Sequence, residues 1–174
     1  MGLPLQHIVV KWCKWFFSIP KDIHPSIDTV GIHSSINQTD PDLWFLAGSF
    51  GNIEPIIRRC TIPSGRSIVF PILEKEDSFS EDTDLKTESD LIKRCTRAMD
   101  LVVHMEAALD GQRIESQRVL SQVFDLVFPT NNVYDVQPGK TRSVCDGYWI
   151  FLKPLSSGKH RVRFMGEAYT MLAT

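Results

Sequence analysis

Two histidines and an aspartate in one irregular segment are the residues whose types best suit metal chemistry in this 174-residue sequence. His24, Asp28 and His33 follow one another at spacings of four and five residues. Two histidines and a carboxylate are a known ligand set for a transition metal. The spacing has no geometric meaning in a segment without regular structure, so the same residues also fit an ordinary loop. We keep the three as a candidate metal site, and we predict no bound cofactor and no catalytic residue.

Aromatic and basic residues suggest a second chemistry, the binding of a sugar or of an anionic surface. An exposed tryptophan can stack on a sugar ring, and Trp44 and Trp149 are the candidates. Lys159, Arg161 and Arg163 could attract an anionic ligand. Both tryptophans lie in apolar runs, where a place in the core is the usual role, and three basic residues on one strand usually form a solvated face.

Eight acidic residues between positions 74 and 90 form the strongest local concentration of charge. Calcium requires six to eight oxygen ligands, but this stretch has neither a glycine nor the spacing of a calcium loop. It therefore predicts a solvated acidic loop over residues 74–90. The whole chain carries a formal charge of −2, from 19 basic and 21 acidic residues. Because the chain as a whole is not basic, we predict no nucleic-acid partner.

The four cysteines, Cys13, Cys60, Cys95 and Cys145, contain no Cys-x-x-Cys pair. A zinc knuckle or a thioredoxin-like motif is therefore not indicated. A free cysteine commonly acts as a small buried apolar residue. Two disulfides are also arithmetically possible, with three connectivities, and the spacing selects none of them.

Residues 5–17 have the spacing of an amphipathic helix. Its apolar face carries Ile8, Val9, Trp12, Trp15 and Phe16. Three alternatives follow for this face: it packs on a sheet, it binds a membrane surface, or it contacts a second copy of the chain. Packing on a sheet is the ordinary outcome.

A second helix is predicted over residues 88–103, with Thr87 and Asp90 as a capping box. The dipeptide Asp110-Gly111 then predicts a hairpin over residues 104–115. Five apolar or alternating runs predict strands, and several of them follow turns that end in glycine and a basic residue. The alternation also places His160 on the apolar side of the last strand. The predicted strands are residues 43–50, 67–73, 119–128, 141–153 and 160–166.

Several phrases of the sequence are similar to a family of prokaryotic proteins, many of them secreted, that carry no assigned activity. The phrases include Trp-Phe-Leu-Ala-Gly-Ser-Phe-Gly at residues 44–51 and Asp-Gly-Tyr-Trp at residues 146–149. The resemblance implies the same kind of fold and an exported origin. It also implies a cysteine in the loop at residues 31–35 that would pair with Cys60, but this chain has no cysteine there.

We therefore predict a single domain over residues 1–174, an antiparallel β-sandwich of jelly-roll type with an N-terminal helix and one inserted helix. The predicted function is a non-enzymatic binding module for a carbohydrate or another anionic surface. The alternatives are a hydrolase or metal-dependent enzyme with a loop-built site, which could include Glu54, and a structural homo-oligomer. No run of about 18 apolar residues is present, so we predict no membrane span. The sequence leaves the protein partner and the compartment open.

Overall fold

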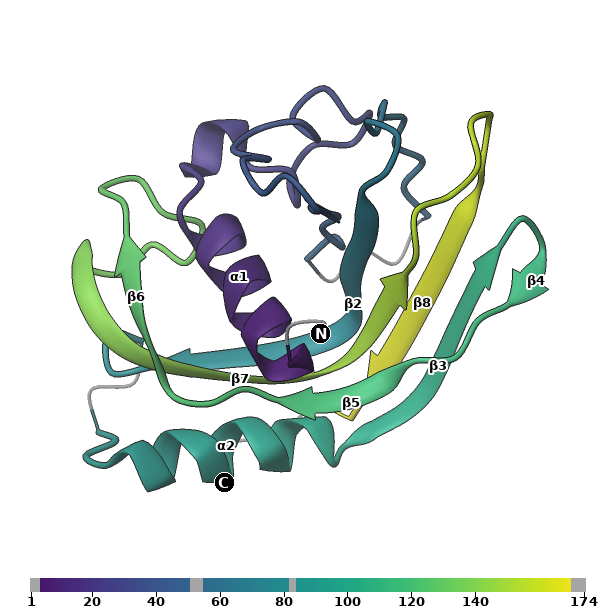
Figure 1. Ribbon diagram of the computed structural model, residues 1–174. Coiled ribbons are helices and arrows are strands. Elements are labelled where there is room, and N and C mark those ends of the chain that lie inside the picture. Colours follow the sequence, from purple (N-terminus) through teal and green to yellow (C-terminus); the bar gives the residue numbers. More distant parts are fainter. Residues whose placement is uncertain (1–3, 51–54, 82–83, 170–174) are drawn as a thin grey trace.

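A computed structural model describes residues 4–50, 55–81 and 84–169. It consists mainly of sheet, with two helices and one short 3-10 helix. Sheet A is strongly curled and wraps around α1, while α2 lies against the opposite side (Figure 1). The elements are α1 (Leu5–Phe17), η1 (Lys21–Ile23), β1 (Leu43–Phe45), β2 (Ser67–Ser78), α2 (Glu88–Met99), β3 (Val102–Leu109), β4 (Gln112–Arg113), β5 (Gln117–Leu120), β6 (Phe124–Phe128), β7 (Gly139–Leu152) and β8 (Val162–Ala168).

Strand β7 is the centre of sheet A. It pairs antiparallel with β2 along most of its length, and with β5 and β6 on its other edge. Strand β1 joins the far side of β2 in parallel orientation, so the expectation of a purely antiparallel fold is wrong. Sheet B is antiparallel and has the order β4-β3-β8. Nothing in these strand orders supports a jelly roll, although the two sheets pack together like part of a sandwich.

The inner face of sheet A, defined here as the face toward α1, holds the largest hydrophobic core. The helix spans the predicted residues and buries its aromatic stripe: Trp12, Trp15, Phe16 and Phe17 are at most 6% exposed. The ring of Trp12 packs edge-on against Trp149 of β7, at a centroid distance of 5.2 Å. The apolar face of α1 is thus covered by its own sheet and offers no surface to a membrane or to a second copy of the chain.

The outer face of sheet A is covered in two halves. Sheet B covers one half, where the ring of Phe70 on β2 packs at a tilt against Phe164 of β8, with centroids 4.7 Å apart. Helix α2 covers the other half through Leu91 and Cys95, which pack against Val144 of β7. The predicted capping box forms, because the side chains of Thr87 and Asp90 each accept a backbone N–H of the other. The two sides of sheet A therefore have separate cores.

Three sequence-based boundaries need correction. Helix α2 ends at Met99 and β3 begins at Val102, because the alternation read as the helix end is already strand. The run over residues 119–128 forms two strands, both paired with β7. The acidic stretch is not one solvated loop: residues 74–78 belong to β2, and Glu76 and Asp77 have no exposed surface. Sheet pairing fixes these acidic residues inside the protein.

Candidate functional site

A β-bulge in β2 decides which acidic side chains enter the core. Residues Ile68 and Phe70 lie on the outer face, and simple alternation would place Glu74 and Glu76 there too. The register shifts between Pro71 and Leu73, so one extra residue is inserted at this point. Beyond the bulge the even-numbered positions therefore face α1. Bulges commonly redirect side chains in this way.

Glu76 is the most deeply placed carboxyl on the inner face. Its side chain is completely buried, and Oε1 accepts a hydrogen bond from the hydroxyl of Ser143 on β7. Among the described residues, Oε2 has no hydrogen-bond partner. Burial raises the pKa of Glu76 well above its usual value, and the nearby carboxyl of Glu81 raises this pKa further. A proton on one of two neighbouring carboxyls removes their mutual repulsion, so this pair favours a bound proton.

Glu74 lies one pleat away on the same face. The thiol of Cys145 donates a weak hydrogen bond to its Oε2 at 3.6 Å. Although the residue keeps a little exposed surface, protein surrounds its carboxyl, and burial raises the pKa of Glu74 to about 7. Lys75 opposes this shift from the neighbouring position. Glu74 therefore changes its charge near neutral pH.

The indole N–H of Trp149 points into the same region. Trp149 is completely buried, and its Nε1 has no hydrogen-bond acceptor among the described residues. The position is fixed by Gly147, which lies opposite Glu74 in the β2–β7 pair. A Cβ at residue 147 would lie 2.8 Å from Cβ of Glu74 and 2.9 Å from Nε1 of Trp149. Both side chains therefore converge on the space above this glycine.

Two further groups border these residues and complete the site, which we call the inner carboxyl site. Its members are Glu74, Glu76, Ser143, Cys145 and Trp149, with Cys13 of α1 and Tyr134 of the β6–β7 connection at its border. Burial raises the pKa of the Tyr134 phenol, and Glu74 and Glu76 raise this pKa further. Burial likewise raises the pKa of the Cys13 thiol. At neutral pH the border groups are therefore uncharged hydrogen-bond donors.

The chemistry of the inner carboxyl site follows from this mixture of groups. It contains carboxyl oxygens that accept hydrogen bonds and an indole N–H that donates one, all in a region shielded from water. Unpaired polar groups in such a region are costly. The site can therefore hold protons, and it suits a ligand that donates and accepts hydrogen bonds within a short distance. Strongly raised carboxyl pKa values are also typical of functional sites.

The candidate metal ligands do not form a metal site. His24 is buried: its Nε2 lies 2.9 Å from the carbonyl of Phe16 and its Nδ1 2.6 Å from the hydroxyl of Ser26. Burial lowers the pKa of His24 to about 4, so it is neutral near pH 7. Asp28 instead accepts three backbone N–H groups of its own loop, including that of His33. Within the described ranges no three His, Cys, Asp or Glu side chains could hold a metal ion together. Glu54 lies outside the described residues.

The candidate binding residues are also dispersed. Trp44 and Trp149 are 4% and 0% exposed, so neither presents a ring face to solvent. Lys159, Arg161 and Arg163 are exposed, but only Arg163 lies in β8. Acidic neighbours reduce their local field, since the carboxylate of Asp110 accepts the backbone N–H of Arg161. The structure brings the tryptophans and the basic residues to no common surface.

His160 is exposed rather than in the core, because β8 begins two residues later, at Val162. Its Nδ1 lies 2.7 Å from Asp110, and its Nε2 lies 3.4 Å from the hydroxyl of Ser156. This order of groups looks like a catalytic triad, but Nε2 is closer to the carbonyl of Ser156, at 2.9 Å. If Nε2 donates a hydrogen bond to that carbonyl, it cannot also accept the proton of the Ser156 hydroxyl, as a triad requires. Hydrogen bonds among these three residues instead join the tips of two loops, an arrangement we call the clasp.

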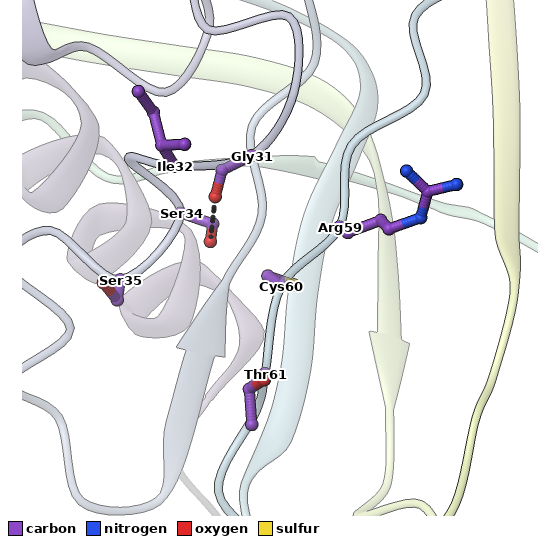
Figure 2. A pocket seen from close by; sticks show the side chains of 7 residues that line it. All are labelled: Gly31, Ile32, Ser34, Ser35, Arg59, Cys60 and Thr61. Carbon is purple, nitrogen blue, oxygen red and sulfur yellow. Dashed lines mark hydrogen bonds between the residues drawn. The ribbon is translucent and has the colours of Figure 1, made fainter.

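Two open depressions lie on the surface that the described residues form. One, of about 380 Å³, is open to solvent and lies between the loop at residues 31–35 and residues 59–61. Figure 2 shows that the hydroxyl of Ser34 bonds to the carbonyl of Gly31, while the side chain of Arg59 points away from the other lining residues. Cys60 lies here. The residue as a whole is exposed, but burial of its thiol group raises the pKa of Cys60. A raised pKa does not suit a nucleophilic thiol. The second depression, of about 470 Å³, contains Asp125 between Lys140 and Arg142, which already form ion pairs with it.

Sequence reasoning missed the inner carboxyl site because it assigned Glu74 and Glu76 to a loop. One signal was present: Pro71 interrupts an otherwise regular strand pattern. Proline inside a strand is common at edges and bulges, since it cannot donate a backbone hydrogen bond. A bulge at this proline would have turned the following glutamates toward the core.

No protein-family model, no curated protein and no solved structure matches this chain. Among the residues that the structure describes, no helix is long and apolar enough to cross a membrane.

Proposed function

We propose that this protein is a non-enzymatic binding domain whose ligand is a small polyhydroxylated molecule, such as a saccharide, held at the inner carboxyl site. The observation that carries the proposal is the pair of buried, unpartnered polar groups on one face of sheet A. These are Oε2 of the Glu76 carboxyl and Nε1 of Trp149, which donates. A polyhydroxylated ligand can serve both groups through separate hydroxyls, because each hydroxyl donates one hydrogen bond and accepts others.

The charge of the site favours a neutral or donor-rich ligand over an anion. The pKa values of Glu74 and Glu76 are raised because additional negative charge is unfavourable in this region, and a sulfated or phosphorylated group would add such charge. A carboxyl group can exchange hydrogen bonds with ligand hydroxyls whether it is protonated or ionised. We therefore propose that the carbohydrate ligand binds in the interior and not at the basic surface.

Access would come from the open side of β2. Strand β1 pairs only with Ser67, Ile68 and Val69, so the described part of the chain adds no strand along the edge that carries Glu74 and Glu76. Helix α1 and the connection that carries Tyr134 cover the rest of the inner face. Binding therefore requires a small displacement of one of these covers. Such movements on ligand binding are common in proteins.

The proposal is tested by thermal shift and calorimetry with the full chain against neutral monosaccharides, disaccharides and polyols, with sulfated sugars as an anionic comparison. A ligand that binds stabilises by RT ln(1 + [L]/Kd), about 2.7 kcal/mol at a hundredfold excess over Kd. We expect a shift with a neutral sugar that Glu76→Gln abolishes. The matched control, Glu167→Gln, changes an exposed carboxyl on β8 and should keep the shift.

Two results would overturn the proposal. A shift with sulfated sugars only, lost when Lys159, Arg161 and Arg163 are changed to Gln, would move the site to the basic surface. No shift with any sugar or polyol would remove the ligand class.

Acid–base catalysis is the second candidate function, and it rests on Glu74. A carboxyl with a pKa of about 7 can accept and donate protons efficiently at neutral pH. This candidate predicts that a bound sugar or another ligand is chemically changed on prolonged incubation. The product would be absent with Glu74→Gln and present with Glu167→Gln.

A further inference from the structure

The sequence contains one acceptor motif for an N-linked glycan, at residues 37–39, which read Asn-Gln-Thr. Such a motif is an asparagine, then any residue except proline, then serine or threonine. Neither serine nor threonine stands two positions after any of the other asparagines, which are Asn52, Asn131 and Asn132. A glycan is bulky and needs a position at the surface. The exposure of Asn37 and Thr39 therefore decides whether the motif can be used.

The middle residue of the motif is fastened to β1. Nε2 of Gln38 donates hydrogen bonds to the backbone carbonyls of Phe45 at 2.7 Å and of Ser34 at 3.1 Å. Its Oε1 accepts the backbone N–H of Phe45 at 3.0 Å. The backbone carbonyl of Gln38 in turn accepts a hydrogen bond from the guanidinium of Arg66, also at 3.0 Å. These four hydrogen bonds hold Gln38 against the body of the protein.

The first and third residues of the motif are both exposed. In the part of the chain that the structure describes, the side chains of Asn37 and Thr39 make no hydrogen bond. Asn37 has a φ of 52°, a conformation that asparagine adopts more readily than most residues. The backbone N–H of Thr39 donates to the carbonyl of Asn37 at 2.8 Å, which closes a tight turn. The carboxamide of Asn37 and the hydroxyl of Thr39 therefore remain available to an enzyme.

The residues on either side of the motif are anchored to α1. The backbone carbonyl of Ile36 accepts the indole N–H of Trp15 at 2.9 Å. The carboxylate of Asp40 forms an ion pair with Lys11 at 2.7 Å. The turn is thus held from both ends, and a group attached to the exposed carboxamide would extend into solvent.

We propose that Asn37 is an acceptor site for an N-linked glycan, which a transferase takes from a lipid-linked oligosaccharide. The amide nitrogen of Asn37 attacks C1 of the first sugar. The new N–C1 bond replaces the bond between C1 and the pyrophosphate oxygen, and the lipid pyrophosphate leaves with the electron pair. The amide nitrogen gives one proton to a base of the transferase, and nothing is oxidised or reduced. The inference is independent of the ligand proposed for the inner carboxyl site.

The experiment combines the folded full chain with a purified oligosaccharyltransferase and a lipid-linked oligosaccharide. A synthetic peptide of residues 32–42 is the unfolded substrate for comparison. We expect both substrates to gain the mass of one glycan, and tryptic peptide 22–58 of the full chain should carry it on Asn37. Thr39→Ser is the matched control and should keep the modification, whereas Thr39→Ala and Asn37→Gln should lose it completely. All three variants change exposed side chains, so they should melt at the temperature of the wild type.

A full chain that stays unmodified while the peptide is modified would overturn the inference, because the fold would then hide the motif. A glycan on a residue other than Asn37 would overturn it as well. The same holds if neither substrate is modified in a reaction where an unrelated acceptor peptide is glycosylated.

Discussion

Glu74 and Gly147 lie directly opposite each other in the β2–β7 pair, and the missing side chain of the glycine makes room for the glutamate. A Cβ at residue 147 would approach the carbonyl oxygen of Leu73 to 2.9 Å, and that backbone atom cannot turn aside. Gly147→Ala should therefore destabilise the protein by roughly 1–3 kcal/mol in urea unfolding. Gly48→Ala is the matched control, because its Cβ would meet only Phe164, at 3.8 Å. Equal stability losses in the two variants would contradict the close approach.

The buried glutamates should make the protein more stable in mild acid than in mild alkali. Burial raises the pKa of Glu74 to about 7, above the value of 4.5 that applies to the unfolded chain. Its contribution to stability is thus fully present below pH 4.5 and is lost as the pH rises through 7. Glu74→Gln, which mimics the protonated form, should therefore gain on the order of 3 kcal/mol relative to wild type between pH 5 and pH 8.

Two histidines also titrate in this pH range. Their effects on stability cancel when Glu74→Gln is compared with wild type. Burial lowers the pKa of His24, so its contribution to stability is lost as the pH falls toward 4. The hydrogen bond to Asp110 raises the pKa of His160, so its contribution is lost as the pH rises. Both groups are unchanged in Glu74→Gln, and only the difference between variant and wild type is used. A difference that stays constant from pH 5 to pH 8 would exclude a raised pKa at Glu74.

The ion pair between Arg118 and Asp146 should be the most important one for stability. Asp146 is 1% exposed, and Arg118 reaches it at 2.7 Å while also bonding to Asp100 and to the carbonyl of Thr96 at the end of α2. Arg118→Met leaves a buried carboxylate without its cation, which should cost about 3–5 kcal/mol in chemical denaturation. The double variant Arg118→Met with Asp146→Asn should lose clearly less stability than the single variant. Similar losses in the single and double variants would show that the pair is not coupled.

The clasp between His160 and Asp110 predicts a local change that NMR can follow. The hydrogen bonds that His160 donates to the carboxylate of Asp110 and to the carbonyl of Ser156 raise the pKa of His160 above 6.5. In Asp110→Asn the pKa of His160 should return toward its ordinary value, as read from its ring proton shifts. Ser156→Ala removes the hydroxyl but not the carbonyl, so it should leave the titration almost unchanged. A pKa that falls equally in both variants would point to a triad-like role for the hydroxyl.

The parts of the fold that depend on local pattern could be predicted from the sequence. The apolar spacing of residues 5–17 gave the limits of α1, and Thr87 with Asp90 marked the start of α2. The apolar run around Trp149 predicted a strand, which is β7. The turn glycines Gly65 and Gly158 have the positive φ that their turns require. In each case neighbouring residues determine the structure.

The candidate site could not be predicted because it depends on pairing between distant residues. Alternation alone places Glu76 on the same face as Phe70, and only the bulge moves it beneath α1. The parallel partner β1 and the contact of His160 with Asp110 likewise join segments far apart in the sequence. A charged residue is normally assigned to the surface, so a composition-based reading assigns buried acids such as Glu76 and Asp77 to a loop.

The most direct test of the inner carboxyl site is an NMR titration of the full chain with glutamate labelled at its carboxyl carbon. Glu76→Gln and Glu74→Gln would assign the two resonances, and Glu167→Gln would identify an exposed glutamate for comparison. We predict that Glu74 titrates near pH 7 and that Glu76 titrates well above the usual range of a glutamate. If Glu74 and Glu76 both titrated together with the exposed glutamates, the buried carboxyl site would be refuted.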